Sequence, residues 1–214
     1  MKTFILQVMA ICAISLTANA QLQMGTQVSS LTGHGNNDNH TTLVGAVVLA
    51  KVALIGNISI GSAIHIYSPK KTKYSNGKVS YSATDKVTSI AATTDMMLGA
   101  KGSPFQPYVG MDMGISTSNH DIEYVNAIKK TQKYAIKEMF VMVSPKIGVN
   151  IALGSSFGIF SQVQYNYSPG DGGKTTINLY DGKNAYALTT EPISKYINID
   201  AGIYMQLSNM KKIF

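Results

Sequence analysis

The sequence has no arginine and no tryptophan, and its single cysteine, Cys12, lies close to the N-terminus. Only 14% of the 214 residues are charged, against about 25% in a typical soluble domain. The net charge is +7, and lysine supplies every basic side chain. Without arginine for bidentate contacts to bases, this charge does not favour a nucleic-acid partner. The low charge content indicates a protein with an extensive apolar surface.

The first twenty residues predict an export signal. Lys2 gives a basic start, residues 4–16 form an apolar run, and Ala18-Asn19-Ala20 is a small-x-small cleavage site. The run is shorter than the ~20 apolar residues that a membrane-spanning helix requires. We expect cleavage before Gln21. Because Cys12 lies inside the signal, the mature chain would have no disulfide, no thiolate nucleophile and no cysteine metal site.

Residues 195–207 show the clearest alternation of side-chain type in the chain. A period of two is typical of a β-strand with one apolar and one polar face. A soluble barrel would turn the apolar face inward, whereas a strand in a membrane barrel turns it to the lipid and its polar face to the lumen. The apolar face consists of Ile197, Ile199, Ala201, Ile203, Met205 and Leu207, and the opposite face of Tyr196, Asn198, Asp200, Gly202, Tyr204 and Gln206.

Eight such segments are expected, at residues 21–31, 42–54, 57–67, 87–99, 106–117, 137–152, 157–167 and 195–207. Short connections at 55–56, 100–105 and 153–156 alternate with long polar ones at 32–41, 68–86, 118–136 and 168–194. Barrels of the outer membrane have short periplasmic turns and longer extracellular loops. The sequence therefore predicts an all-β fold, an eight-stranded antiparallel up-and-down transmembrane β-barrel. It would form one domain, residues 21–214, after the signal at residues 1–20.

The whole pattern resembles the small eight-stranded outer-membrane barrels of the OmpA/OmpX type. The C-terminal strand is similar to the assembly signal of that class, in which a glycine precedes spaced hydrophobic or aromatic residues. Gly202, Met205 and Leu207 match these places, and Phe214 stands as a terminal aromatic. The resemblance implies recognition by the barrel-assembly machinery, an outer-membrane location and a monomer.

Seven titratable residues fall on the expected polar faces and would therefore lie in the lumen. Eight strands leave an interior just wide enough to be filled by side chains, and charges there must be paired or hydrated. We expect Lys51 and Lys146 to bridge carboxylates from other strands and so plug the barrel; a gated pore is the alternative. The seven are Lys51, His65, Asp95, Asp112, Glu138, Lys146 and Asp200.

A basic stretch is expected in the second long connection, as an extracellular loop that attracts the phosphates of lipopolysaccharide. A merely solvated charged loop is the alternative. Its lysines are Lys70, Lys71, Lys73, Lys78 and Lys86, against one acid, Asp85. Three histidines, His34, His40 and His120, also fall in long connections, but their spacing matches no metal site. No metal or cofactor is expected.

An enzyme is not expected. A deacylase would need a paired serine and histidine at the outer membrane face, but His65 points inward and Ser68 lies on the opposite face of its strand. The favoured role is a non-enzymatic outer-membrane protein that stabilises the envelope or presents its loops, whose ligand the sequence does not identify. The alternatives are a narrow channel for small solutes, a lipid A-modifying enzyme and a soluble exported barrel of lipocalin type.

Overall fold

A computed structural model of the chain describes residues 20–31, 41–54, 57–75, 80–100, 103–125, 131–169, 175–180, 185–190 and 195–206. Nearly all of these residues are in strands, and none of the described segments is a helix long and apolar enough to cross a membrane. The strands are β1 (Ala20–Leu31), β2 (Thr41–Ala53), β3 (Ile58–Tyr67), β4 (Lys70–Ser75), β5 (Ser80–Met97), β6 (Phe105–Val125), β7 (Thr131–Ala152), β8 (Phe157–Tyr167), β9 (Thr175–Tyr180), β10 (Ala185–Thr190) and β11 (Lys195–Gln206).

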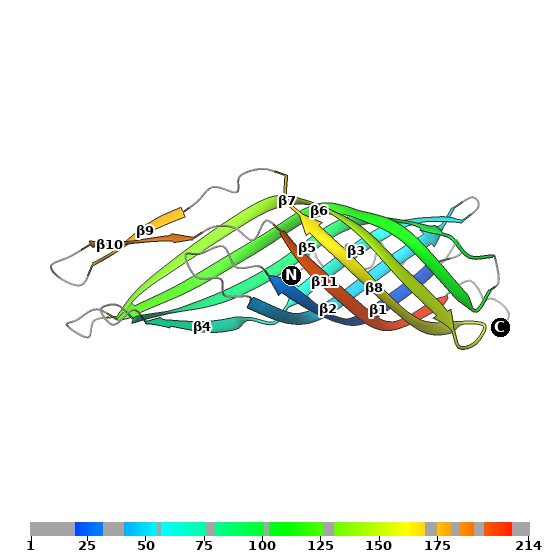
Figure 1. Ribbon diagram of the computed structural model, residues 1–214, viewed down its shortest axis with the longest axis horizontal. Helices are drawn as coiled ribbons and strands as arrows, with labels where there is room; N and C mark the ends of the chain where they lie inside the picture. The colour runs from blue at the N-terminus through cyan, green and yellow to red at the C-terminus, as the bar shows by residue number, and fades with distance from the viewer. Residues whose placement is uncertain are drawn as a thin grey trace, which may run out of the picture.

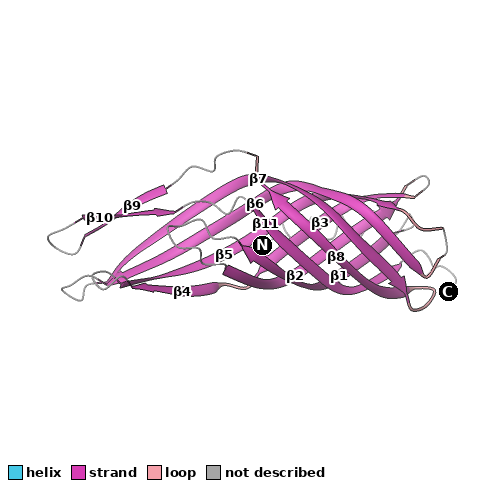
Figure 2. Cartoon of the chain, in the orientation of Figure 1, coloured by secondary structure: helices cyan, strands magenta, loops and turns pink. Residues whose placement is uncertain are grey.

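Eight of the described strands close into an antiparallel barrel (Figures 1 and 2). Their order around the wall is β1, β2, β3, β5, β6, β7, β8 and β11, so each strand lies beside the next one along the chain. The last strand then pairs with the first, and Gly202 lies opposite Gly25. This closure leaves no open edge in the barrel wall. The predicted all-β, eight-stranded up-and-down barrel is confirmed.

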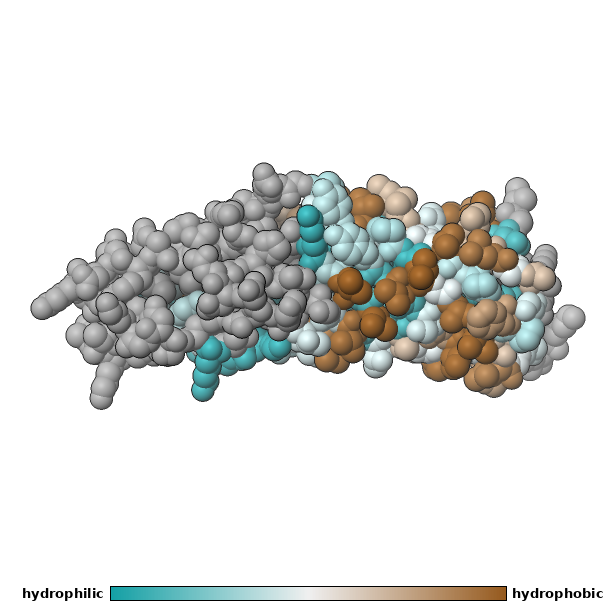
Figure 3. Space-filling view, in the orientation of Figure 1, coloured by the Kyte–Doolittle hydropathy of each residue, from teal (hydrophilic) through white to brown (hydrophobic). Residues whose placement is uncertain are grey.

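The barrel has its polar side chains inside and its apolar side chains outside. On β11, Ile197, Ile199 and Ile203 are exposed, whereas Asn198 and Asp200 are buried. The other barrel strands likewise expose large apolar side chains, and Figure 3 shows apolar side chains on the outer surface of the barrel. The interior is polar for the most part, but it also holds a buried apolar cluster that includes Val47, Leu49 and Met142. The face assignment made from the period-two alternation therefore holds.

One wall of the barrel continues beyond the other. The pairing of β5, β6 and β7 runs out to Ser80, Val125 and Thr131, and β4 continues β3 along β5. Between Ile66 and Lys70 the pairing with β5 shifts by one residue, at a segment that contains Pro69. We call this part of the sheet, β4 with residues 80–87 of β5, 118–125 of β6 and 131–138 of β7, the outer wall.

The prediction of long polar loops at 68–86 and 118–136 is therefore wrong for most of these residues, which lie in strands. The outer wall keeps its β pairing, but polar side chains cover its outward face, so the sequence there lacks the apolar alternation that marks a lipid-facing strand. Within the predicted loop at 168–194, β9 and β10 pair as a hairpin. The short connections, by contrast, lie where the sequence placed them.

Candidate functional site

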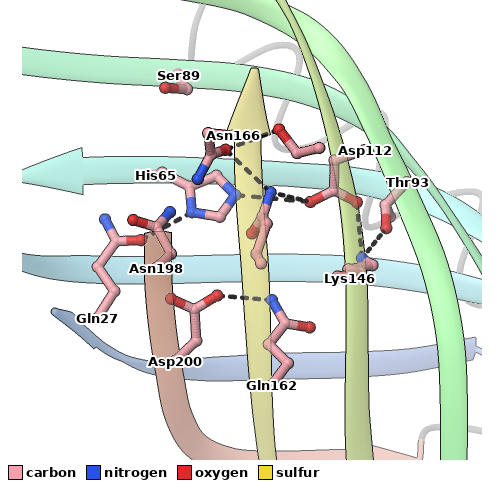
Figure 4. A network of polar contacts seen from close by, with 12 residues as sticks. Gln27, His65, Ser89, Thr93, Asp112, Lys146, Gln162, Asn166, Asn198 and Asp200 are labelled. Atoms are coloured by element: carbon pink, nitrogen blue, oxygen red, sulfur yellow. Dashed lines mark hydrogen bonds and ion pairs between the residues drawn. The ribbon is translucent and has the colours of Figure 1, made fainter. Parts of the chain in front are cut away.

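The centre of the lumen holds a cluster of buried charges around Lys146. The Nζ atom of Lys146, on β7, lies 2.6 Å from Asp112 Oδ1 on β6 and 3.1 Å from Asp95 Oδ1 on β5. Lys146 also donates a hydrogen bond to the hydroxyl of Thr93 (Figure 4). These side chains are almost entirely buried. One lysine thus neutralises carboxylates from two strands.

Lys51 reaches the same cluster from the other side of the barrel. Its Nζ atom pairs with Asp95 Oδ2 and donates to Gln23 Oε1 at 3.0 Å. It also lies 5.1 Å from the centre of the Tyr108 ring, a favourable position for a cation. In the order of the wall, β2 and β7 are four strands apart in either direction. Lys51, Asp95 and Lys146 therefore form a chain of ion pairs across the full width of the lumen.

His65 and Asp200 complete the central charges. His65 Nδ1 lies 2.7 Å from Gln27 Oε1, and His65 Nε2 lies 3.8 Å from Asp112 Oδ2. Asp200 Oδ2 accepts a hydrogen bond of 2.6 Å from the amide of Gln162. Two lysines, one histidine and three aspartates therefore lie buried together in the central lumen.

Amide side chains join this cluster into one network to which all eight barrel strands contribute. Gln164 donates to Asp112 Oδ2 at 3.1 Å, and the hydroxyl of Tyr108 donates to Gln162 Oε1 at 2.8 Å. The amide of Gln23 donates to Asn150 Oδ1 at 3.2 Å. These neutral groups donate to a carboxylate oxygen of Asp112 and to one another, which lowers the cost of burying the charges.

A layer of apolar and aromatic side chains lies outward of the ion cluster. It is formed by Leu43, Tyr67, Val87 and Tyr196, and the rings of Tyr67 and Tyr196 pack edge to face with centroids 6.5 Å apart. The hydroxyl of Tyr67 donates to Asn198 Oδ1 at 2.8 Å. The lumen thus also contains an apolar cluster, whose chemistry differs from that of the ion cluster.

A separate charged group stands in the outer wall, beyond the apolar layer. His120 Nδ1 lies 2.7 Å from Asp85 Oδ1, while Nε2 lies 3.0 Å from the hydroxyl of Ser118 and 3.5 Å from Glu138 Oε2. Burial alone would lower the pKa of His120, but the hydrogen bond and charge of Asp85, with the charge of Glu138, outweigh it and raise the pKa above 6.5. This group ties β5, β6 and β7 together outside the lipid-facing part of the barrel.

The structure therefore divides the seven expected lumen residues into two places. Glu138 lies beside His120 in the outer wall, away from the central network. His120 itself was expected in a loop and lies instead on β6, facing the interior. The other six come together in the centre of the barrel: Lys51, His65, Asp95, Asp112, Lys146 and Asp200.

The lysines expected in a loop lie on strands of the outer wall, apart from Lys78, which falls outside the described residues. Lys70, Lys71 and Lys73 are on β4, and Lys86 is on β5. Lys71 lies 3.5 Å and Lys133 3.0 Å from the carboxylate of Glu123. The hydrogen bond from Lys133 and the charges of Lys133 and Lys71 lower the pKa of Glu123. The acids of β6 thus partly neutralise this basic surface.

Two other predicted features are only partly visible. In the expected assembly signal, Gly202 and Met205 lie on β11, with Met205 exposed on the outward face, while Leu207 and Phe214 fall outside the described residues. Residues 1–19 of the expected signal segment, His34 and His40 also fall outside them, while Ala20 begins β1. Among the described residues, no group of three or more histidines and carboxylates is arranged to hold a metal ion.

An interior of charges and amides under an exterior of apolar side chains is the reverse of a soluble protein. It is the arrangement of a barrel whose solvent is lipid. The fold is that of a small outer-membrane β-barrel. No protein-family model and no curated protein sequence matches the chain, so the fold is recognised from structure alone.

Solved structures of outer-membrane barrels match this barrel over most of its length. Neisserial surface protein A has a TM-score of 0.54 at 13% identity, covering 87% of this chain and 96% of its own. Ail of Yersinia pestis, in complex with the heparin analogue sucrose octasulfate, has a TM-score of 0.54 at 10% identity, covering 89% and 99%. A major outer membrane protein of Thermus thermophilus has a TM-score of 0.54 at 11% identity, covering 87% and 99%.

Sequence reasoning missed the amide groups of the network and the Asp85–His120–Glu138 group. The glutamines could have been found, since Gln23, Gln27, Gln162 and Gln164 all fall on polar strand faces. His120 gave no such signal, because the strand in which it lies was predicted to end before it. The face of the strand on which His120 lies can be assigned only once β6 is known to extend to Val125.

Proposed function

We propose that this protein is a non-enzymatic outer-membrane barrel with a plugged lumen, which anchors the outer wall at the cell surface. In this role the barrel spans the outer membrane, and β4 with the outer parts of β5, β6 and β7 stands outside it. The outer wall then serves envelope structure or surface interaction. The lipid-facing apolar belt and the polar interior support the location.

The observation that carries the proposal is the chain of ion pairs across the lumen. Lys51 from β2 and Lys146 from β7 meet on Asp95, and each of the three side chains is at most 3% exposed. A solute passing through would have to separate these charges in a narrow, low-dielectric space. Breaking a buried pair of this kind typically costs about 3–5 kcal/mol.

A narrow channel is the second candidate, and unpaired polar atoms in the lumen favour it. Among the described residues, Asp200 Oδ1, Gln164 Oε1 and Asn150 Nδ2 have no hydrogen-bond partner. Buried polar atoms of this kind are usually satisfied by water. Water in the lumen would give a path for small ions if the ion pairs rearranged.

Conductance in planar lipid bilayers separates the two candidates. We expect the wild-type protein to show no current steps, in bilayers where a general porin does. The double variant Lys51→Ala/Asp95→Ala removes one cation and one anion from the lumen and should produce small steps. The matched control, Lys133→Ala/Glu123→Ala, removes the same charges from the exposed outer wall and should stay silent. Stable wild-type steps would establish the channel instead.

A further inference from the structure

The outward face of the barrel changes from apolar to cationic at the same end of three strands. On each of these strands, an exposed lysine lies two or four positions beyond the last exposed large apolar residue, in the direction of the outer wall. An even spacing places both side chains on the same outward face of the strand. These pairs are Ile90 and Lys86 on β5, Met139 and Lys137 on β7, and Ile197 and Lys195 on β11. We call Lys86, Lys137 and Lys195 the lysine collar.

The opposite rim of the barrel has a different chemistry. Beside the short connections, the exposed large side chains are apolar and include Leu54, Ile58, Leu98, Phe105, Leu153 and Phe157. Every exposed lysine in the described part of the chain lies at the outer end or in the outer wall. Within the described residues, the exposed lysines are therefore confined to one end of the barrel.

The collar also differs from the rest of the outer wall in how its charges are balanced. Lys71 and Lys133 share the carboxylate of Glu123. Among the described residues, no carboxylate lies within ion-pair distance of Lys137 or Lys195, and Lys195 Nζ instead lies 5.8 Å from the centre of the Tyr167 ring. In the collar only Lys86 has an acidic partner, Asp121 at 2.7 Å. The collar therefore keeps an excess of positive charge.

We propose that the lysine collar binds the phosphate groups of the phosphorylated glycolipid in the outer leaflet. This inference rests on the proposed membrane location, because only an embedded belt places the collar at the depth of the headgroups. Lysine side chains extend from an apolar surface toward such a layer, and each adds favourable binding to an anionic surface. Lys86 and Lys137 both lie opposite Asn119. At ~4.8 Å between strands, they stand about 10 Å apart and can contact two phosphates of one lipid.

Native mass spectrometry of the full protein in detergent, titrated with lipid A, tests this proposal. The collar variant is Lys86→Gln/Lys137→Gln/Lys195→Gln. The matched control, Lys71→Gln/Lys73→Gln/Lys133→Gln, removes the same charge from the outward face farther from the belt. Because each lysine near an anionic surface adds to binding, the collar variant should bind lipid A at least tenfold more weakly. The control should bind within about twofold of the wild type.

Two further probes fix the chemistry of the ligand. Dephosphorylated lipid A should bind as weakly to the wild type as lipid A binds to the collar variant. If phosphatidylglycerol competes with lipid A equally well for binding to the wild type, the glycolipid is not the specific ligand and that part of the proposal is overturned. Equal losses in the collar and control variants would also overturn the proposal, because bulk charge would then explain the binding. A gel-migration assay of each variant shows whether the barrel is folded, so a failure of membrane insertion is distinguished from a failure of lipid binding.

Discussion

At the scale of single residues, the buried charges of the lumen are held by ion pairs in which one side chain contacts two partners. Lys146 contacts both Asp95 and Asp112, and Asp95 also contacts Lys51. A buried ion pair of this kind adds little stability compared with an apolar replacement of both partners. Removing only one partner, however, leaves the other as a buried charge without a counter-charge. The two aspartates therefore depend on Lys146 more than an exposed acid depends on its partner.

Replacing Lys146 by methionine should destabilise the barrel strongly. The change keeps the length of the side chain but leaves Asp112 without its 2.6 Å partner and Asp95 with Lys51 alone. We expect a loss of about 3–5 kcal/mol in the free energy of unfolding, measured by urea titration in detergent. Lys73→Met, at an exposed position on β4, is the control and should change stability by less than about 0.5 kcal/mol. Equal values for the two variants would show that the lumen ion pairs are not needed.

His120 should make the stability of the outer wall depend on pH. The pKa of His120 is raised above 6.5 in the fold, so its protonated form is favoured by folding. The resulting stability is fully present below about pH 6.5, the ordinary pKa of histidine, and is lost as the pH rises through the raised value.

The variant His120→Gln tests this dependence, because it keeps hydrogen bonding but cannot carry a charge. Between mildly acidic and mildly alkaline buffer, the wild-type outer wall should lose roughly 1–2 kcal/mol of protection, measured by amide hydrogen exchange on β5, β6 and β7. In the variant, this loss should disappear after correction for intrinsic exchange. A wild-type loss that persists in the variant would assign the effect to another group.

At the scale of elements, β7 carries a proline in the middle of the barrel wall. Pro145 pairs with Met111 on β6, but the pairing of β7 with β8 is interrupted at Ser144 and Pro145. The register is the same on both sides of the gap, so no residue is inserted. Proline lacks the N–H that the ladder would use there. The hydroxyl of Ser144 donates instead to Asn166 on β8, at 2.7 Å.

Pro145→Val should stabilise the barrel, because valine supplies the missing N–H and fits a lipid-facing strand. We expect a gain of about 1 kcal/mol in the free energy of unfolding in detergent. Val143→Ile, on the same outward face of β7, controls for the change in apolar surface. A loss of stability in Pro145→Val would mean that the interrupted ladder is required by the local twist of the wall.

At the scale of the whole molecule, the closed sheet and the apolar outer surface together suit the protein to a lipid environment. Each barrel strand pairs with two neighbouring strands, and the exposed large side chains between the rims are apolar. Such an object is stable in detergent or lipid and insoluble without them.

The whole chain should therefore migrate differently on a denaturing gel when it is not boiled. The closed ladder keeps the barrel compact in detergent, and only heating opens it. Circular dichroism of the unboiled sample should show β structure and no helix. A protein that stays soluble in plain buffer and shows no shift in migration would contradict the membrane barrel.

The sequence by itself determined which face of each barrel strand meets lipid. Alternation with a period of two is a local property, so Asp200 and Ile199 could be assigned to opposite faces without any knowledge of their neighbours. The short connections were equally local, since turn-forming residues such as those at 100–105 interrupt the pattern. Together these two signals were sufficient for the barrel and its strand number.

Only the tertiary structure decided which charges meet. Lys51 and Lys146 lie on opposite walls, and both reach Asp95 because ring closure and strand register bring these positions to one level. The outer wall was hidden for a related reason. Its outward residues are polar, so its strands give no apolar alternation, and only pairing with neighbours far along the chain holds His120 beside Asp85 and Glu138. Side-chain direction follows from the local chain, whereas contact across the lumen depends on how the whole sheet closes.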